Sequence, residues 1–257
     1  MKTDTKSCYL LYLLFSSTMD KFIYYRLIGY LVTLCTHLTN LAVVTSRLQQ
    51  KLPSNPELTI FLNLQYRYLT IWTTVFQVIY AIMGLVCDTL IIIGKKSPTI
   101  TTIRDASYKY FSAIVLPFAV LVFTLFWPIY FYDKPLVFPP KSNMVICPTS
   151  NIVFHAFILP VVVWELVFQP KKIYVSHTHS CVYILLMYVI YNTSLFYTRY
   201  GDYGVWPYLI LKVLEGTIFF PLFFIFILFV LYTSYFTQSH LKSKVWEYRE
   251  KIYIKEH

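Results

Sequence analysis

Two polar side chains, Thr70 and His155, lie just inside the starts of two long apolar segments of this 257-residue chain. A threonine hydroxyl is a weak nucleophile until a neighbouring base removes its proton. A neutral imidazole is such a base, and burial favours the neutral form of histidine. If the two side chains face each other, they suffice for acyl transfer, with Thr70 as the nucleophile and His155 as the base.

Each of these residues also has a purely structural interpretation. Threonine is common in membrane helices, where its hydroxyl bonds its own backbone or a neighbouring helix. A histidine at the start of a helix can simply lie at the membrane surface. Polar groups inside a membrane are expensive, however, so a function is the first explanation to test.

The composition decides the class of protein that must position the pair. The chain is 57% hydrophobic and 13% charged, whereas a soluble domain carries about 25% charged residues. Its apolar residues form blocks that match the roughly 20 residues needed to cross a bilayer, and the alternating segments of a β-barrel are absent. We therefore predict an all-α polytopic membrane protein whose helices form one bundle, with spans at about 22–46, 66–93, 108–131, 151–168, 181–197 and 208–236.

The distribution of basic residues predicts the orientation. An even number of spans puts both ends on one side, and that side would hold most of the Lys and Arg residues, so both termini should be cytoplasmic. Thr70 and His155 then share the opposite leaflet. We expect an amino-terminal extension at 1–21, one transmembrane hydrolase domain at 22–236 and a basic cytoplasmic tail at 237–257. No signal decides between the endoplasmic reticulum and the plasma membrane.

The amino end allows two interpretations. The short apolar run at 8–15 follows two lysines and faintly resembles a signal peptide, but it is too short to span a membrane. Met19 follows soon afterwards. We prefer an extension ahead of a chain that could start at Met19, and the signal-peptide alternative stays open.

Two further patterns lie close to the pair. Thr70, Thr74 and Gln77 fall at i, i+4 and i+7 and form one polar stripe on a helix. Gln77 lies about 10 Å further along the axis, so we expect it to contact helices or lipid rather than a reacting group. Pro160 removes the backbone bond to the carbonyl of Ala156, which predicts a free acceptor and a kink there.

Other polar residues are weaker candidates. Asp88 and Glu165 lie toward the cytoplasmic ends of their spans, and Glu165 is about 15 Å from His155 along one helix, too far for a third catalytic member. His177 and His179 form an H-x-H pair in a predicted loop without further metal ligands. We expect no cofactor and no metal.

Charge and cysteine usage limit the kinds of partner that the sequence predicts. The formal charge of +10 lies in the connectors and the tail, so it indicates membrane orientation and not nucleic acid. Lys212 and Glu215, at i and i+3, are expected to pair locally. The five cysteines show no paired spacing and predict no disulfide framework. The expected partners are the membrane and a lipid substrate, and the sequence identifies no protein partner.

At the same residues the chain resembles the androgen-induced protein and FAR-17a family of multipass membrane proteins, over about 19–236. No single block is specific, but their order and spacing are. The matching blocks are Tyr68-Leu69-Thr70 with Gln77, Arg104-Asp105, Leu116-Pro117-Phe118-Ala119-Val120, Phe126-Trp127 with Tyr132-Asp133, His155 with Leu159-Pro160 and Glu165, and Trp206-Pro207-Tyr208.

The resemblance implies a threonine hydrolase that cleaves fatty acid esters of hydroxy fatty acids, with Thr70 and His155 at the family's catalytic positions. Family members often carry Asp or Asn where this chain has Thr73, Thr where it has Ala156, and His where it has Ile152. Two alternatives stay open. A lipid transporter or channel would place polar residues along a path through several spans, and a non-enzymatic membrane regulator would need neither Thr70 nor His155.

Overall fold

The computed structural model describes residues 5–95, 97–139, 141–169 and 176–256, with side chains described between 22 and 248. Within these residues the chain forms helices and no strands, and six helical segments are long and apolar enough to cross a membrane. The predicted all-α polytopic class is confirmed. The protein is an integral multipass membrane protein whose six candidate spans are Phe22–Ser54, Leu69–Ile92, Pro98–Tyr132, Pro148–Phe168, His177–Asp202 and Phe219–Tyr248.

Several spans are built from more than one helical element. The α-helices are α1 (Thr5–Lys51), α2 (Leu58–Leu64), α3 (Leu69–Ile92), α4 (Pro98–Tyr110), α5 (Leu116–Tyr132), α6 (Pro148–Ile152), α7 (Ile158–Phe168), α8 (His177–Tyr197), α9 (Leu209–Leu214) and α10 (Phe219–Glu256). Three π-helical turns lengthen them, namely η3 (Phe111–Val115), η6 (Val153–Phe157) and η7 (Thr198–Asp202). Single 3-10 turns are η1 (Leu52–Ser54), η2 (Gln65–Arg67), η4 (Lys134–Leu136) and η5 (Ser142–Met144).

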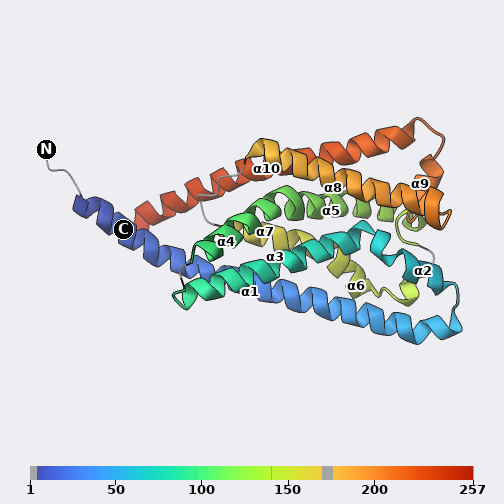
Figure 1. The fold of residues 1–257 in the computed structure, drawn as a ribbon, viewed down its shortest axis with the longest axis horizontal. Coiled ribbons are helices and arrows are strands. Elements are labelled where there is room, and N and C mark those ends of the chain that lie inside the picture. The colour runs from blue at the N-terminus through green and yellow to red at the C-terminus, as the bar shows by residue number, and fades with distance from the viewer. Residues whose placement is uncertain (1–4, 96, 140, 170–175, 257) are drawn as a thin grey trace.

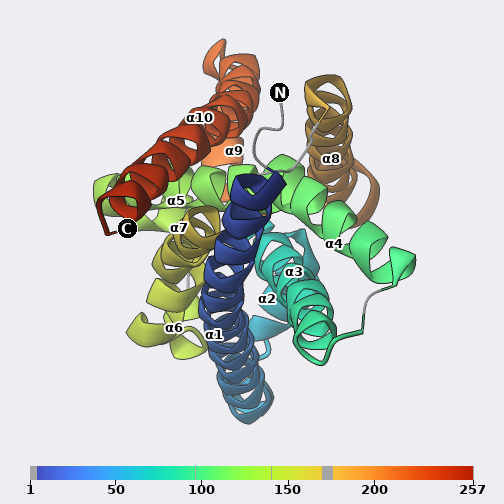
Figure 2. The same ribbon diagram turned by 90° about the vertical axis from the view of Figure 1, so that its left-hand side faces the viewer.

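The helices run roughly along one long axis (Figure 1). In the end-on view, α1 lies between α3 and α7, while α8 and α10 lie on the opposite side of α5 from α1 (Figure 2). The η3–α5 part of this span therefore occupies the centre of the bundle, whereas α4 extends toward its outside. The start of α1 and the end of α10 lie at one end of the molecule, called here the terminal end, and α2, α6 and α9 lie at the other, called the site end.

The observed spans differ from the predicted ones at their boundaries. The third helix begins at Pro98, so Arg104 and Asp105 belong to its first turns and not to a connector. The sixth span, predicted at 208–236, begins later than predicted, because the chain breaks between α9 and α10 at Gly216, whose φ of +83° suits glycine. The predicted tail at 237–257 continues α10 as helix as far as Glu256, and the whole of the predicted 1–21 extension lies outside the residues whose side chains are described.

Inside the bundle, apolar side chains form one main core that joins α3, α5, α7, α8 and α10. The outer faces of the bundle carry many exposed apolar side chains, such as Ile82, Val86, Leu186 and Phe229. A surface of this kind suits lipid and not water. Many of the buried polar side chains bond to partners on other helices.

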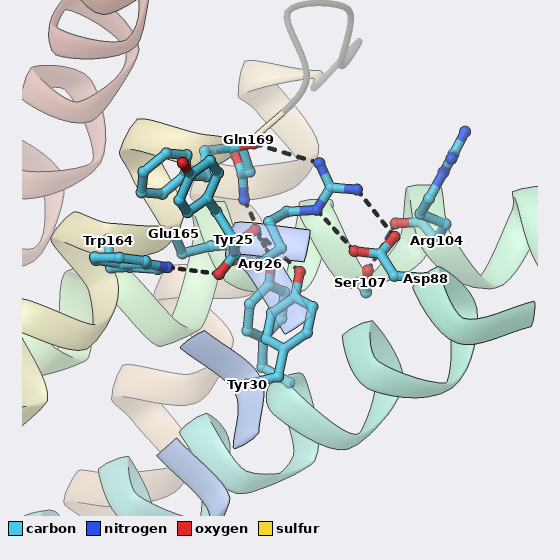
Figure 3. Close-up of polar contacts among 11 residues, drawn as sticks. Tyr25, Arg26, Tyr30, Asp88, Arg104, Ser107, Trp164, Glu165 and Gln169 are labelled. Carbon is cyan, nitrogen blue, oxygen red and sulfur yellow. Dashed lines mark hydrogen bonds and ion pairs between the residues drawn. The ribbon is translucent and has the colours of Figure 1, made fainter. Parts of the chain in front are cut away.

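A buried ion pair joins α1 to α3 near the terminal end (Figure 3). Arg26 Nε lies 2.8 Å from Asp88 Oδ2 and Arg26 Nη2 lies 3.0 Å from Oδ1, which is a two-pronged contact with both side chains nearly inaccessible. The same guanidinium reaches the Phe168 carbonyl on α7. One turn away, the Tyr30 ring packs directly over Gly84, where a Cβ would clash at 2.4 Å. The close approach of α1 and α3 therefore needs both the ion pair and this glycine.

Glu165 on α7 belongs to the same polar region. Its carboxylate accepts hydrogen bonds from Tyr80 on α3 at 2.5 Å and from Tyr30 on α1 at 3.3 Å. Gln169, at the end of α7, donates to the Tyr80 hydroxyl and accepts from Lys242 on α10. Four helices are thus tied together at this level, and Asp88 and Glu165 are accounted for as packing groups.

Removing one member of the buried pair should destabilise the protein strongly. Asp88→Asn leaves the Arg26 charge buried without its partner, which costs about 3–5 kcal/mol. A thermal unfolding scan of the purified protein in detergent should show a much lower Tm. The matched control is Asp105→Asn, since Asp105 is exposed at the same end, and its Tm should equal that of wild type. Equal Tm values for both variants would contradict a structural role for the pair.

Candidate active site

Thr70 lies in the first turn of α3 because of how that helix begins. The 3-10 turn η2 ends at Arg67, and Tyr68 adopts extended backbone as the N-cap, so α3 starts at Leu69. Thr70 is half-buried at the site end. Its backbone carbonyl accepts from the Thr74 hydroxyl at 2.9 Å.

His155 lies in the middle of the π-helical turn η6, where the α6–α7 span bulges by one residue. Its side chain is buried, with 6% of its surface exposed. A π-bulge is a rare irregularity that occurs often at functional sites, since it re-aims the side chains around it. Here it turns the imidazole of His155 toward α3.

The structure brings the two predicted residues together across two spans. Thr70 Oγ1 lies 3.0 Å from His155 Nε2, and His155 Nδ1 lies 3.0 Å from the backbone carbonyl of Asn151. A carbonyl oxygen only accepts, so Nδ1 carries the proton and Nε2 presents its lone pair. The Thr70 hydroxyl therefore donates to Nε2, which is the arrangement a base needs to take that proton.

Aromatic side chains from α5 hold the imidazole in place. The Phe126 ring stacks on it with centroids 3.5 Å apart and planes 11° apart. The Trp127 indole donates to the His155 backbone carbonyl at 3.1 Å. Because ring and backbone are both fixed by α5, the imidazole has one orientation toward Thr70.

The Trp127 contact follows from the proline later in the same span. Pro160 lies five residues after His155 and has no N–H to return to the preceding turn. The predicted free acceptor was Ala156, but the side-chain donor reaches His155, since the π-helical turn shifts the missing bond by one residue. The same pattern recurs at η3, where Pro117 lies five residues after Ser112 and the Ser112 carbonyl accepts from Gln238 on α10.

Two cavities meet at the pair. An apolar cavity extends into the bundle between α3, α5, α8 and α10, and a second lies toward α1 and α2. Four residues line both, namely Thr70, Val137, His155 and Tyr208. A third cleft, of about 1350 Å³ and open at the site end, shares Val137 and Tyr208 with them. The Thr70–His155 contact thus lies between an apolar interior and a polar mouth.

The rest of the predicted polar stripe supports helix packing, as expected for Gln77. Its amide oxygen accepts from His37 Nε2 on α1 at 2.7 Å, and its amide nitrogen donates to the Ile158 carbonyl at 2.9 Å. Thr73 donates to its own helix at Leu69. Sequence reasoning missed His37, whose only signal is a single imidazole in an apolar run.

The remaining predictions give mixed outcomes. His177 begins α8 and is not in a loop, and its Nδ1 lies 3.0 Å from the Tyr235 hydroxyl of α10. The four cysteines with described side chains are free, and Cys8 lies outside the described side chains. In those described side chains, no group of three or more metal-ligand residues gathers.

The expected pairing of Lys212 with Glu215 is wrong. Glu215 accepts from the Trp206 indole at 3.0 Å, from the Tyr200 hydroxyl at 2.7 Å and from the Arg199 guanidinium at 3.3 Å. These three donors, Trp206 first among them, lower the pKa of the Glu215 carboxyl to about 2. The break at Gly216 lets the carboxylate turn toward η7 instead of along α9.

The fold and this site define a six-span helical membrane protein with a buried, hydrogen-bonded threonine–histidine pair. The family model described as FAR-17a/AIG1-like protein matches residues 25–243, so the chain belongs to that family.

Relatives with curated names extend this comparison. The chain is similar to "Androgen-dependent TFPI-regulating protein" from Mesocricetus auratus, with 28% identity over 55% of this chain and 60% of the relative. The Homo sapiens protein of the same name is 26% identical over 63% of this chain and 71% of the relative. The matched region thus spans less than two thirds of the hamster relative's length. No solved structure matches the chain.

The tautomer of His155 can be observed directly. In the protein labelled with ¹⁵N-histidine, Nδ1 should show the chemical shift of a protonated nitrogen and Nε2 that of a lone-pair nitrogen accepting a hydrogen bond. Thr70→Val should move the Nε2 signal and leave Nδ1 in place, because only Nε2 loses a partner. A protonated Nε2 in wild type would contradict the assigned arrangement.

Proposed function

We propose that this protein is an intramembrane lipid esterase that hydrolyses fatty acid esters of hydroxy fatty acids. The observation that carries the proposal is the 3.0 Å contact between Thr70 Oγ1 and the unprotonated Nε2 of a buried, orientated His155. Membership of the family is compatible with hydrolysis, and the positions coincide with the catalytic ones that the sequence resemblance implies.

The reaction runs in two steps that use the same pair. Thr70 Oγ attacks the ester carbonyl carbon while His155 Nε2 takes the hydroxyl proton. The tetrahedral intermediate collapses, the C–O bond of the ester breaks, and the leaving alkoxide takes the proton from His155 as the hydroxy fatty acid departs. Water then attacks the acyl-threonine with His155 as base, which releases the fatty acid and restores Thr70.

The shape of the cavities supports a lipid substrate. The cavity that extends into the bundle is lined by apolar side chains such as Val122, Leu125, Leu195 and Ile227, which suit an acyl chain. The opposite cavity and the open cleft give water and the released product a way toward the site end. An ester placed across Thr70 would thus have its acyl chain in the interior.

Charge in the open cleft supports a substrate with a free carboxylate. Lys141 pairs with Glu57 and Arg199 pairs with Glu215, so each of these cations is already neutralised. Lys212 lines the same cleft, is exposed, and has no ion-pair partner among the described residues. The carboxylate of a hydroxy fatty acid would complement this ammonium.

A non-enzymatic role is the second candidate, and the curated name of the relatives favours it. That name describes regulation of TFPI, and a regulatory effect of this chain would survive the loss of Thr70 and His155. Transport is less well supported, because Gln77 and Glu165, deep in their spans, are engaged in helix-to-helix contacts.

Replacement of either member of the pair should abolish hydrolysis. Thr70→Ala removes the nucleophile and His155→Ala the base, and each should lower kcat by about 10³-fold or more. Release of fatty acid from a branched hydroxy-fatty-acid ester, measured in membranes with equal expression, gives the readout. Thr89→Ala on the exposed far end of α3 and His179→Ala are matched controls. Substantial turnover by Thr70→Ala would overturn the proposed mechanism.

Lys212 should set the preference for a free carboxylate. Lys212→Ala should raise KM for the free-acid substrate about fivefold, because an exposed ion pair contributes up to about 1 kcal/mol. KM for the methyl ester of the same substrate should not change. Lys244→Ala, an exposed lysine at the terminal end, should alter neither constant. An equal change for both substrates would contradict a carboxylate contact.

A further inference from the structure

Hydrolysis at Thr70 would place negative charge on the substrate's carbonyl oxygen, and that oxygen needs hydrogen-bond donors near the pair. Removal of one such donor typically lowers kcat by about 10²–10³-fold. The Trp127 indole is engaged with the His155 carbonyl, and the Thr73 and Thr74 hydroxyls are engaged with their own helix. The donor has to come from elsewhere in the cavity walls.

Tyr208 is placed to supply it. Its side chain lines both cavities that Thr70 and His155 line, and with Val137 these are the residues common to the two. The Tyr208 hydroxyl oxygen accepts from the backbone N–H of Leu69 at 2.8 Å, which fixes it beside the residue that precedes Thr70. The phenol therefore lies at the first turn of α3 next to the nucleophile.

The hydroxyl proton of Tyr208 is available for a hydrogen bond to a substrate. Among the described residues the Tyr208 hydroxyl only accepts hydrogen bonds, and its O–H donates none. The neighbouring Tyr191 hydroxyl lies 3.5 Å away, at the limit of a hydrogen bond, and it donates to the Arg67 carbonyl at 3.2 Å. Burial raises the pKa of Tyr208 to about 12, so the phenol keeps its proton at neutral pH.

The backbone beside Tyr208 adds a second donor. The N–H groups of the first helical turn have no partner within the helix and point out of its N-terminus. Leu69 donates its N–H to Tyr208 and Ile71 donates to the Tyr68 carbonyl, whereas the N–H of Thr70 donates to no group in the described part of the chain. The positive end of the α3 dipole lies at the same place and favours developing negative charge.

We infer that the Tyr208 hydroxyl, together with the backbone N–H of Thr70, stabilises the oxyanion formed when Thr70 attacks the ester carbonyl. This inference rests on the proposed function and deepens it. The Tyr208 oxygen receives a hydrogen bond from Leu69 while its proton turns to the substrate oxygen, so one side chain joins the helix start to the reacting carbonyl.

Side-chain contacts fix the position of the connector that carries Tyr208. Glu215 binds the Trp206 indole and the Arg199 guanidinium, and Arg199 also donates to the Gly204 carbonyl. These contacts tie the segment between α8 and α9 to the π-helical turn η7. Tyr208 is thereby presented to the cavities from a fixed backbone and not from a free loop.

The test is a comparison of kcat for hydrolysis of a hydroxy-fatty-acid ester by the full-length purified protein. Tyr208→Phe keeps the ring and removes the hydroxyl, so kcat should fall about 100-fold with little change in KM. Tyr232→Phe is the matched control, because Tyr232 donates to the Cys181 carbonyl and neither residue lines either cavity, and its kcat should equal that of wild type. A kcat of Tyr208→Phe within threefold of wild type would overturn the inference.

A second substitution separates donation from support of Leu69. Replacing Tyr208 by 3-fluorotyrosine makes the phenol a stronger donor and a poorer acceptor. An oxyanion donor predicts a kcat equal to or above that of wild type, whereas a phenol that only holds Leu69 predicts a lower one, which would refute the inference even if Tyr208→Phe fails to fold. Absence of hydrolysis by wild type would instead overturn the proposed function, so the two failures are distinguishable.

Discussion

A polar side chain buried among apolar helices has to find its hydrogen-bond partner within the protein, because lipid offers none. This constraint fixes the relative positions of the helices. Arg26 and Asp88 hold α1 against α3, and Glu165 draws α7 to both of them through Tyr30 and Tyr80. Apolar packing alone would let these helices slide, so the polar contacts set the depth at which each lies.

Thr70 and His155 meet as a consequence of that arrangement. They lie on different spans and are brought within 3.0 Å by helices whose register is set elsewhere. The His37–Gln77–Ile158 contact links α1, α3 and α7 midway between the terminal end and the site. Buried polar contacts between spans therefore occur at successive levels from the ion pair to the site.

Irregular backbone segments set the final positions of the side chains at the site. The bulge at η6 aims the His155 ring, the break at Gly216 frees Glu215 to hold the Tyr208 connector, and the extended Tyr68 starts α3 one residue before Thr70. The bulge at η6 and the start of α3 each leave a backbone group without its usual helical partner, and a side chain from another element supplies one, as Trp127 does for His155 and Tyr208 does for Leu69. The site is thus built where regular helix geometry fails.

The sequence by itself determined the class of protein, its six apolar spans and the two residues that meet, since length and hydropathy respond directly to the bilayer and a lone polar residue in such a span stands out. Only the tertiary structure decided the tautomer of His155, the role of His37, the partner of Glu215 and the place of Tyr208. Those depend on contacts between residues far apart in the chain. Local spacing favoured Lys212 with Glu215, but a single glycine turn sent that carboxylate to Trp206 and Arg199 instead.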